Sequence, residues 1–283
     1  MTSRFLEYCR ARERAAAAAV LPPYKTIAID LQHGHFRAIG NAWTRAVFDG
    51  DFHRSASNGD IPVTNLVFVE SREGNTGADD PSALGGGETD KHLIYEGLSR
   101  VEADAVFAGA TTARHDELVF SIWHPQLITL RLDLGKPRHP AQVMVVSRSS
   151  LHFETALMFQ EPELLVYLVT TSDAAASLRL QVATRPWISV IDGGQPLSMR
   201  TALRQLKSHG IETMSAIGGR TTARAMLREG VIRDLYLTTS PKSAGEPDTP
   251  LLEEPLDAPA VVVKRGTGPE EGVRFVHYNL GGS

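Results

Sequence analysis

The chain contains two places where an apolar, strand-like run turns through glycine directly into a helical pattern. One is Ile217-Gly218-Gly219-Arg220-Thr221-Thr222, and the other is Ala105-Val106-Phe107-Ala108-Gly109-Ala110-Thr111-Thr112. Glycine lets the backbone approach a ligand closely, and the N–H groups of a first helical turn attract an anion. Two such turns in one α/β chain predict a phosphate-bearing ligand held between neighbouring strand ends.

Strands and helices alternate through most of the sequence. Short β-branched or apolar runs are separated from segments of helical periodicity by glycine, proline and capping residues. The expected strands are residues 65–70, 105–108, 142–146, 164–169, 188–191, 213–217 and 233–238, the expected helices are residues 89–101, 198–209 and 221–229, and residues 260–265 and 273–278 are expected to form a C-terminal antiparallel hairpin. This order is typical of a mainly parallel central sheet with helices on both faces.

An N-terminal extension, residues 1–60, precedes the main domain, residues 61–283. The elements expected in the extension are a helix over 3–20, strands over 25–30 and 35–39 that pair with each other, and an irregular polar stretch over 41–60. Because this segment has little apolar material for a core of its own, we expect it to pack on the main domain or on a partner subunit.

Composition argues against several kinds of partner. The formal net charge is −4 with basic residues scattered, so we expect no nucleic-acid partner. The single cysteine, Cys9, excludes an internal disulfide framework and a cysteine-based zinc site, and none of the 10 histidines shows metal-ligand spacing, so no metal is expected. The alanine-rich uncharged run Ala15 to Pro22 is too short for a bilayer and lacks a signal-peptide core. We therefore expect a cytoplasmic protein with no membrane partner.

Ligands of open α/β sheets bind where parallel strands end, which selects the candidate cofactor residues. Arg148 presents a planar charged group suited to a phosphate monoester, although a surface arginine at a strand end explains it equally well. Thr170 is either a ligand contact or part of a helix N-cap. Neither a Rossmann fingerprint nor a P-loop is present. The candidates are Gly109, Ala110, Thr111, Thr112, Ser147, Arg148, Thr170, Gly218, Gly219, Arg220, Thr221 and Thr222.

A second cluster of polar residues lies at the end of the strand 65–70. It begins Ser71-Arg72-Glu73-Gly74-Asn75 and continues as a glycine-rich stretch to Gly87. Such a loop is either a mobile binding segment or lid, or a plain surface loop. Asp116 and Glu117, which follow the first Gly–Thr-Thr turn, either bind or protonate a polar substrate or are simply solvated.

Together these motifs resemble the RibD C-terminal domain family of riboflavin-pathway pyrimidine reductases, whose members share the dihydrofolate reductase fold. The likeness spans residues 63–280. It rests on three motifs. The first is an apolar strand that ends in a Ser-x-x-Gly turn, and the second is an Ala-Asp-Ala strand followed by Gly-x-x-Thr. The third is a Gly-Gly pair followed by a helix and then by a strand that ends in proline. These motifs stand at Asn65–Gly74, Arg100–Arg114 and Ile217–Pro241.

The resemblance implies NADPH as hydride donor. Its adenosine and diphosphate would lie against Gly109–Thr112 and Gly218–Thr222, with Ser147 and Arg148 at the 2′-phosphate. The nicotinamide would face Ser71 and the loop from Gly74 to Gly87. On this basis the candidate catalytic residues are Ser71, Asp116 and Glu117, and the candidate substrate-binding residues are Asn65 and Asn75. The family's habit of pairing through a sheet edge implies a homodimer.

The sequence departs from the family pattern on the substrate side. Asn75 replaces a lysine, Ile217 replaces a glutamate, and residues 116–123 replace the stretch that grips the substrate's phosphoribityl arm. No N-terminal deaminase zinc motif is present. The expected function is therefore NADPH-dependent reduction of a pyrimidine- or pterin-like small molecule, resembling 5-amino-6-(5-phosphoribosylamino)uracil reductase. A non-catalytic NADPH-binding or sensing protein is the alternative.

Overall fold

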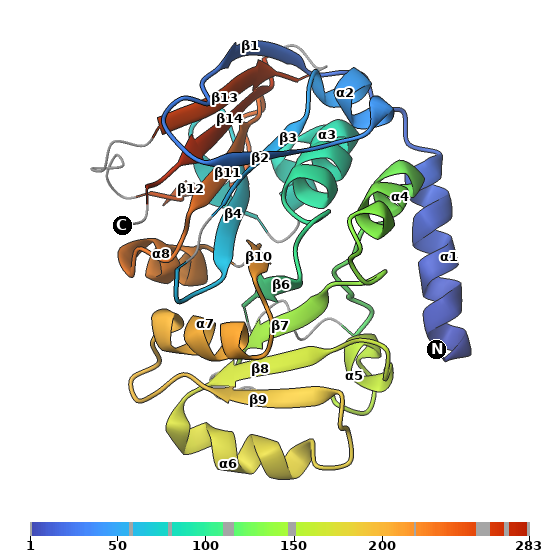
Figure 1. Cartoon of the computed structure of the whole chain (residues 1–283), viewed down its shortest axis with the longest axis vertical. Helices are drawn as coiled ribbons and strands as arrows, with labels where there is room; N and C mark the ends of the chain where they lie inside the picture. The colour runs from blue at the N-terminus through green and yellow to red at the C-terminus, as the bar shows by residue number, and fades with distance from the viewer. Residues whose placement is uncertain are drawn as a thin grey trace.

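The structure, a computed structural model, describes residues 2–56, 59–78, 81–109, 116–146, 151–217, 219–252, 261–268 and 272–281. Within them one sheet has the strand order β1 (Lys25–Ile29), β13 (Val261–Thr267), β14 (Arg274–Asn279), β11 (Asp234–Thr239), β4 (Val63–Glu70), β10 (Thr213–Ala216), β6 (Ala105–Ala108), β7 (Ala141–Val145), β8 (Val166–Thr170) and β9 (Ile188–Asp192) (Figure 1). From β11 to β9 the strands are parallel, whereas β14, β13 and β1 are joined antiparallel. The mainly parallel sheet and the C-terminal hairpin are confirmed.

Helices cover both faces of this sheet, as the alternation predicts. Leu66 of β4 packs with Leu203 and Met226 on one face, whereas the next residue, Val67, packs with Ile94 on the other. The first face carries α7 (Met199–Ser208) and α8 (Arg220–Arg228); the second carries α1 (Ser3–Ala17), α2 (Ala42–Phe48), α3 (Gly87–Thr89) continuing into the π-helix η2 (Asp90–Leu98), α4 (Pro125–Asp133), α5 (Leu157–Gln160) and α6 (Ser172–Gln181).

The N-terminal residues lie against the sheet and add its outermost strand, β1. Phe5 of α1, which runs beside α4 (Figure 1), is fully buried, as are Phe48 of α2 and Phe52 of β3 (Phe52–Ser55). Each of these aromatic rings belongs to a core cluster that also contains main-domain residues.

Two expectations for the N-terminal segment are wrong. The strand β2 (Phe36–Ile39) pairs with β3, while β1 pairs with β13, so the two strands that we expected to pair with each other do not. Residues 41–60 are also not irregular, since they contain α2 and β3. Asn41 and Thr44 close a capping box at the start of α2. A helix of two turns followed by a four-residue strand is too short to give a clear periodicity.

The glycine-rich stretch from Gly74 to Gly87 is more structured than a plain loop. Its first part forms β5 (Asn75–Gly77), which pairs with β12 (Glu246–Pro250), and a 3-10 turn η1 (Pro81–Leu84) follows. The helix after it begins at Gly87, two residues before the expected cap, and Thr89 makes no capping bond. β12 comes from a segment far along the chain, so the local sequence could not reveal this pairing.

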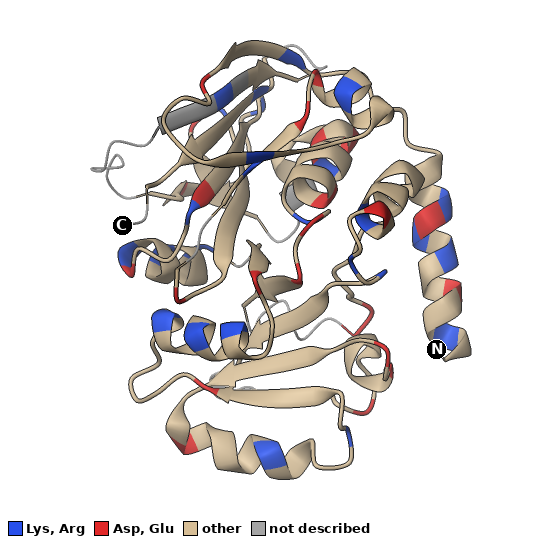
Figure 2. Cartoon of the chain, viewed as in Figure 1, with Lys and Arg blue, Asp and Glu red and all other residues tan. Residues whose placement is uncertain are grey.

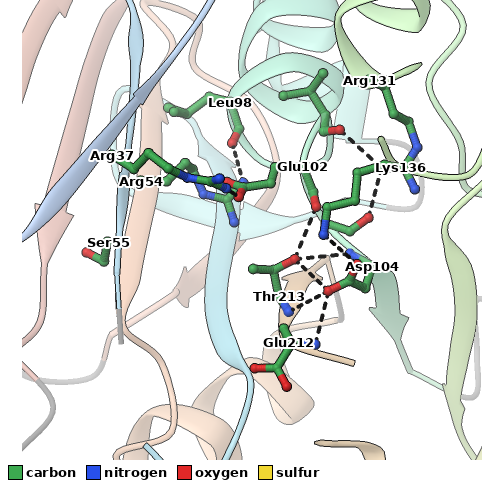
Figure 3. A network of polar contacts seen from close by, with 12 residues as sticks. Arg37, Arg54, Ser55, Leu98, Glu102, Asp104, Arg131, Lys136, Glu212 and Thr213 are labelled. Carbon is green, nitrogen blue, oxygen red and sulfur yellow. Dashed lines mark hydrogen bonds and ion pairs between the residues drawn. The ribbon is translucent and has the colours of Figure 1, made fainter. Parts of the chain in front are cut away.

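Charged groups tie the amino ends of β6 and β10 together (Figure 3). Asp104 accepts hydrogen bonds from the backbone N–H groups of Glu212 and Thr213, at 3.0 and 2.9 Å, and pairs with Lys136 Nζ at 2.6 Å. The buried Arg131 donates from Nη1 to three carbonyls of residues 100–103. These contacts fix the register of two central strands at the edge opposite their carboxyl ends.

Charged residues are spread over several helices (Figure 2). The basic residues of α7 have partners: Arg200 donates to the carbonyl of Glu229, Arg204 pairs with Asp60 at 2.5 Å, and Lys207 pairs with Glu212 at 3.0 Å. In the part of the chain that the structure describes, no helix combines the length and the apolar character needed to cross a membrane.

Candidate functional site

The structure brings the two glycine turns together. β6 and β10 are neighbouring parallel strands, and the N–H of Ile217 donates to the carbonyl of Phe107 at 2.9 Å. A Cβ placed on Gly109 would lie 3.3 Å from Thr222 Oγ1 and 3.9 Å from the backbone nitrogen of Gly219. The backbone after β6 therefore runs against the first turn of α8, as the sequence predicts for paired turns.

The first turn of α8 has the features of an anion site. Gly219 is its N-cap, makes no side-chain capping bond, and would have nothing within 4 Å of an added Cβ among the described residues. The Nη1 atom of Arg220 is buried and, within the described residues, has no hydrogen-bond partner. Helix N-termini carry N–H groups without intrahelical acceptors and a partial positive charge. Among the described residues, the Arg220 guanidinium at this helix N-terminus therefore keeps a donor without an acceptor.

Several predicted cofactor residues lie outside the described residues, and their assignments stay predictions. They are Ala110, Thr111, Thr112, Ser147, Arg148 and Gly218. Of the others, Thr221 is exposed on α8 and Thr222 is half-buried against Gly109.

Thr170, another predicted cofactor residue, is fully buried and holds two strand ends together. Its hydroxyl donates to the carbonyl of Val146 at 2.7 Å, and its own carbonyl accepts from the N–H of Gly193 at 2.8 Å. Because its polar groups are already bonded within the protein, we do not retain the Thr170 side chain as a cofactor contact.

Ser71 and Asn75, the predicted catalytic and substrate-binding residues, shape the turn after β4. The fully buried Ser71 hydroxyl donates to Glu73 at 3.1 Å and accepts from the N–H of Asn75 at 3.2 Å. The side-chain oxygen of Asn75 accepts from the N–H of Thr249 on β12 at 3.2 Å. Both side chains are thus engaged in holding the β4–β5 turn, so we do not retain Ser71 as a catalytic residue or Asn75 as a substrate contact.

Asn65, the second predicted substrate residue, lies in the interior of β4. Its amide donates to the carbonyl of Ser99 at 3.0 Å and accepts from the Ser99 hydroxyl at 2.6 Å, which also lies 2.6 Å from the hydroxyl of Ser215. All three side chains are fully buried. This network joins η2 to β4 and β10, so Asn65 is removed from the site.

Asp116 and Glu117 lie on a different surface of the molecule. Asp116 accepts from His152 Nδ1 at 2.8 Å, and this hydrogen bond lowers the pKa of Asp116, so it is ionised at neutral pH. Glu117 is mostly exposed and lies 3.7 Å from Arg4. An ionised, exposed carboxylate is a poor proton donor.

His152 lines a cavity of about 440 Å³ formed by residues 151–155 and Gln181. Gln181 ends α6, whose first residue, Ser172, follows the carboxyl end of β8. A ten-residue helix spans about 15 Å, which separates this cavity from the sheet edge that carries the glycine turns. The two predicted carboxylates are therefore not brought to those turns.

A buried cluster at the carboxyl end of β11 was missed by the sequence analysis. The Thr238 hydroxyl donates to Oδ1 of Asp90, whose side chain is buried at the start of η2. Burial raises the pKa of Asp90 to about 7, and the bond from Thr238 opposes that rise. The ring of Tyr24, from the segment before β1, lies beside both residues. The sequence signal was an acidic residue between a glycine run and an apolar helix, which we interpreted only as a helix cap.

Within the described residues, no group of three or more His, Cys, Asp or Glu side chains is arranged to hold a metal ion.

Comparison with known proteins relates the chain to one family of reductases. The model of the RibD C-terminal domain family matches residues 74–265, more than half of the chain. A pyrimidine reductase-like protein of Corynebacterium diphtheriae superposes with a TM-score of 0.64 at 23% identity, over 77% of this chain and 92% of that one. No curated protein matches the sequence.

Two further solved structures share the fold. RibD of Acinetobacter baumannii gives a TM-score of 0.56 at 15% identity, over 78% of this chain and 58% of that one. A riboflavin biosynthesis reductase of Saccharomyces cerevisiae gives 0.54 at 13% identity, over 80% and 93% of the two chains. The dihydrofolate reductase-like fold expected from the sequence is thereby confirmed.

Proposed function

Because the chain belongs to the RibD C-terminal domain family, we propose that it is a reductase that uses NADPH to reduce a pyrimidine- or pterin-like small molecule. The family is one of pyrimidine reductase domains, which are oxidoreductases that use a nicotinamide cofactor. Our proposal goes beyond family membership in two respects, the choice of NADPH as the cofactor and the class of substrate.

The observation that supports this proposal is the contact between the two glycine turns. Gly109 and Thr222 meet across the ends of adjacent parallel strands, where an extended ligand can lie over both turns. The buried Nη1 of Arg220, without a partner in the described residues, suits a diphosphate oxygen. No atom of the described residues lies within 4 Å of a Cβ added at Gly219, which suits close approach of a diphosphate. The described residues therefore fit a dinucleotide.

In this arrangement the protein's role is to bind and orient the dinucleotide. The first turn of α8 and the Arg220 guanidinium would hold the diphosphate, and Ser147 and Arg148 are proposed for the 2′-phosphate. The bound nicotinamide supplies hydride, and the protein contributes position, electrostatics and exclusion of water.

The proposed substrate differs from that of the riboflavin enzymes in its polar arm. The family's lysine and glutamate are replaced by Asn75 and Ile217, and the side chain of Asn75 is bonded to Thr249. Residues 116–123 replace the stretch that grips the phosphoribityl arm. We therefore propose a substrate that shares the heterocyclic ring and lacks that arm.

Gly219→Val tests the cofactor site without disturbing the fold. Its φ of −59° suits any residue, and among the described residues no atom lies within 4 Å of the added Cβ. Because valine is a poorer N-cap than glycine, we expect stability to fall by up to about 1 kcal/mol and NADPH affinity, measured by calorimetry, to fall at least about tenfold. Unchanged affinity would remove α8 from the site.

Arg220→Ala provides a second test, with Arg228→Ala on the same helix as its matched control. Arg228 is exposed and donates to a carbonyl within α8. Only the Arg220 variant should weaken NADPH binding.

The non-catalytic alternative predicts that the protein binds NADPH without oxidising it. Candidate pyrimidines and dihydropterins are therefore screened for loss of the reduced-nicotinamide absorbance.

A further inference from the structure

A buried carboxyl group lies at the ligand-binding edge of the sheet, close to where β4 and β11 end. Asp90 is 3% exposed, and its Oδ1 accepts the hydrogen bond from the Thr238 hydroxyl. Thr238 pairs in register with Val69, and the next pair along, Thr239 with Glu70, ends both strands. The carboxyl thus lies one residue from the edge at which ligands bind in parallel sheets.

The surroundings of Asp90 favour its neutral form. In the described residues no basic side chain forms an ion pair with it, and the titratable groups that face it are the phenols Tyr24 and Tyr95. Burial raises the pKa of Asp90 to about 7, so a large fraction of the carboxyl carries a proton at neutral pH. Asp116, in contrast, is ionised there.

Tyr24 leaves a polar atom beside this carboxyl. Tyr24 is 2% exposed, and among the described residues its hydroxyl has no hydrogen-bond partner of good geometry, although Thr238 and Asp90 are its neighbours. A buried hydroxyl without a partner costs free energy, which a bound ligand or water relieves. The Tyr24 hydroxyl, beside Thr238 and Asp90, therefore keeps hydrogen-bonding capacity that suits a polar ligand.

A short glycine segment covers Asp90. A Cβ on Gly86 would lie 2.6 Å from Oδ2 of Asp90, and a Cβ on Gly85 would meet Ser240 and Lys242 at 2.7 Å each. Gly85 and Gly87 have φ values of +95° and +77°, in the region that glycine alone adopts readily. Access of a substrate to Oδ2 requires this segment to move, and its two flanking glycines allow that movement.

We propose that Asp90 is the proton donor of the reduction, with Thr238 as the residue that positions it. This proposal rests on the proposed function. The proton leaves Oδ2 for the nitrogen or oxygen of the C=N or C=O bond being reduced, while the carbon of that bond receives hydride from the reduced dinucleotide. The double bond becomes single, and the carboxylate left behind takes a proton from water. The substrate class is accordingly a heterocycle with an imine or carbonyl bond.

The principal test compares Asp90→Asn with Glu88→Gln. Asparagine keeps the shape of Asp90 and removes its acidic proton. Glu88, two residues earlier, is exposed and pairs with Lys91, so its variant is a matched control. We expect Asp90→Asn to lower kcat at least about 100-fold while the Kd for NADPH stays within about twofold, and Glu88→Gln to change neither.

The pH profile separates proton donation from a structural role. kcat should fall as pH rises through the Asp90 pKa, because only the neutral acid donates. The Thr238 hydrogen bond lowers that pKa, so Thr238→Val should move the falling limb upward by about one pH unit. If the falling part of the kcat–pH profile does not shift in Thr238→Val, the assignment of Asp90 as the proton donor is overturned.

Infrared difference spectra give a readout that needs no substrate. Wild type minus Asp90→Asn should show the carbonyl band of a protonated acid below neutrality and a carboxylate band above it. An ionised Asp90 throughout overturns the inference, as does full kcat in Asp90→Asn when the wild type is active. A wild type that neither binds nor oxidises NADPH overturns the proposed function itself.

Discussion

Thr222 Oγ1 lies 3.3 Å from the point that a Cβ on Gly109 would occupy, so the turn after β6 and the helix after β10 are in contact. Gly109→Val should push these elements apart. We expect a destabilisation of about 1–3 kcal/mol and a loss of NADPH affinity, measured by thermal unfolding and calorimetry. Adding Thr222→Ala removes the clashing hydroxyl and should restore part of the stability; strict additivity of the two changes would contradict this contact.

The pKa of Asp90 gives stability an unusual dependence on pH. It is raised to about 7 in the folded chain from an ordinary value of 3.8, so between these two values the folded state binds more protons than the unfolded state. Unfolding free energy should therefore decrease as pH rises across that interval, by at most roughly 4 kcal/mol. Asp90→Asn should flatten this part of the curve in urea titrations, and an unchanged slope would refute the shift.

The buried carboxylate Asp234 joins the N-terminal residues to the C-terminal hairpin. It accepts from Ser55 Oγ at 2.7 Å and from His277 Nε2 at 2.9 Å. Although burial acts to raise it, the pKa of Asp234 is lowered by His277 and Ser55. Asp234→Ala should destabilise the chain by about 3–5 kcal/mol because it orphans buried partners. The control Asp60→Ala, from an exposed pair with Arg204, should leave the midpoint unchanged.

Cofactor preference depends, in our proposal, on Arg148, which lies outside the described residues. Arg148→Ala should erase the preference for NADPH over NADH by weakening binding of NADPH and leaving NADH nearly unaffected. Competitive titration of the two dinucleotides measures the ratio. Equal affinity of the wild type for both would refute the role of this arginine.

We propose a homodimer that uses β1. In this edge strand Ile27 and Ile29 are 64% and 49% exposed, and exposed apolar edge strands favour pairing with another chain. Ile27→Lys with Ile29→Lys should give a monomer by light scattering. Leu180→Lys, at an 80% exposed position on α6, is the control and should not. A monomeric wild type would contradict the proposal.

The sequence predicted the parts of the fold that depend on local patterns. Strand–helix alternation predicted the parallel sheet, and the two glycine turns predicted the meeting of Gly109 with the start of α8, because parallel neighbours end at the same edge. Ser198 was correctly expected to cap α7, since a side chain and a backbone N–H three residues apart define that bond.

The candidate site was harder to predict because burial and distant partners are not visible in local sequence. Asn65 and Ser71 are polar residues at plausible positions, yet both are fully buried and bonded within the protein. Asp90 was missed for the opposite reason. Its short-range context suggests a helix cap, and its importance comes from Thr238, 148 residues away.

Tyr24 comes from a segment that precedes the 74–265 stretch shared with the family. A hydroxyl beside the proposed reacting centre is thus supplied by a part of the polypeptide on which relatives need not agree. Under the proposed mechanism, we expect that exchanging only the N-terminal segment between two such reductases alters substrate selectivity and leaves the proposed dinucleotide site unchanged. By that reasoning, the substrate selectivity of this protein depends in part on its N-terminal segment.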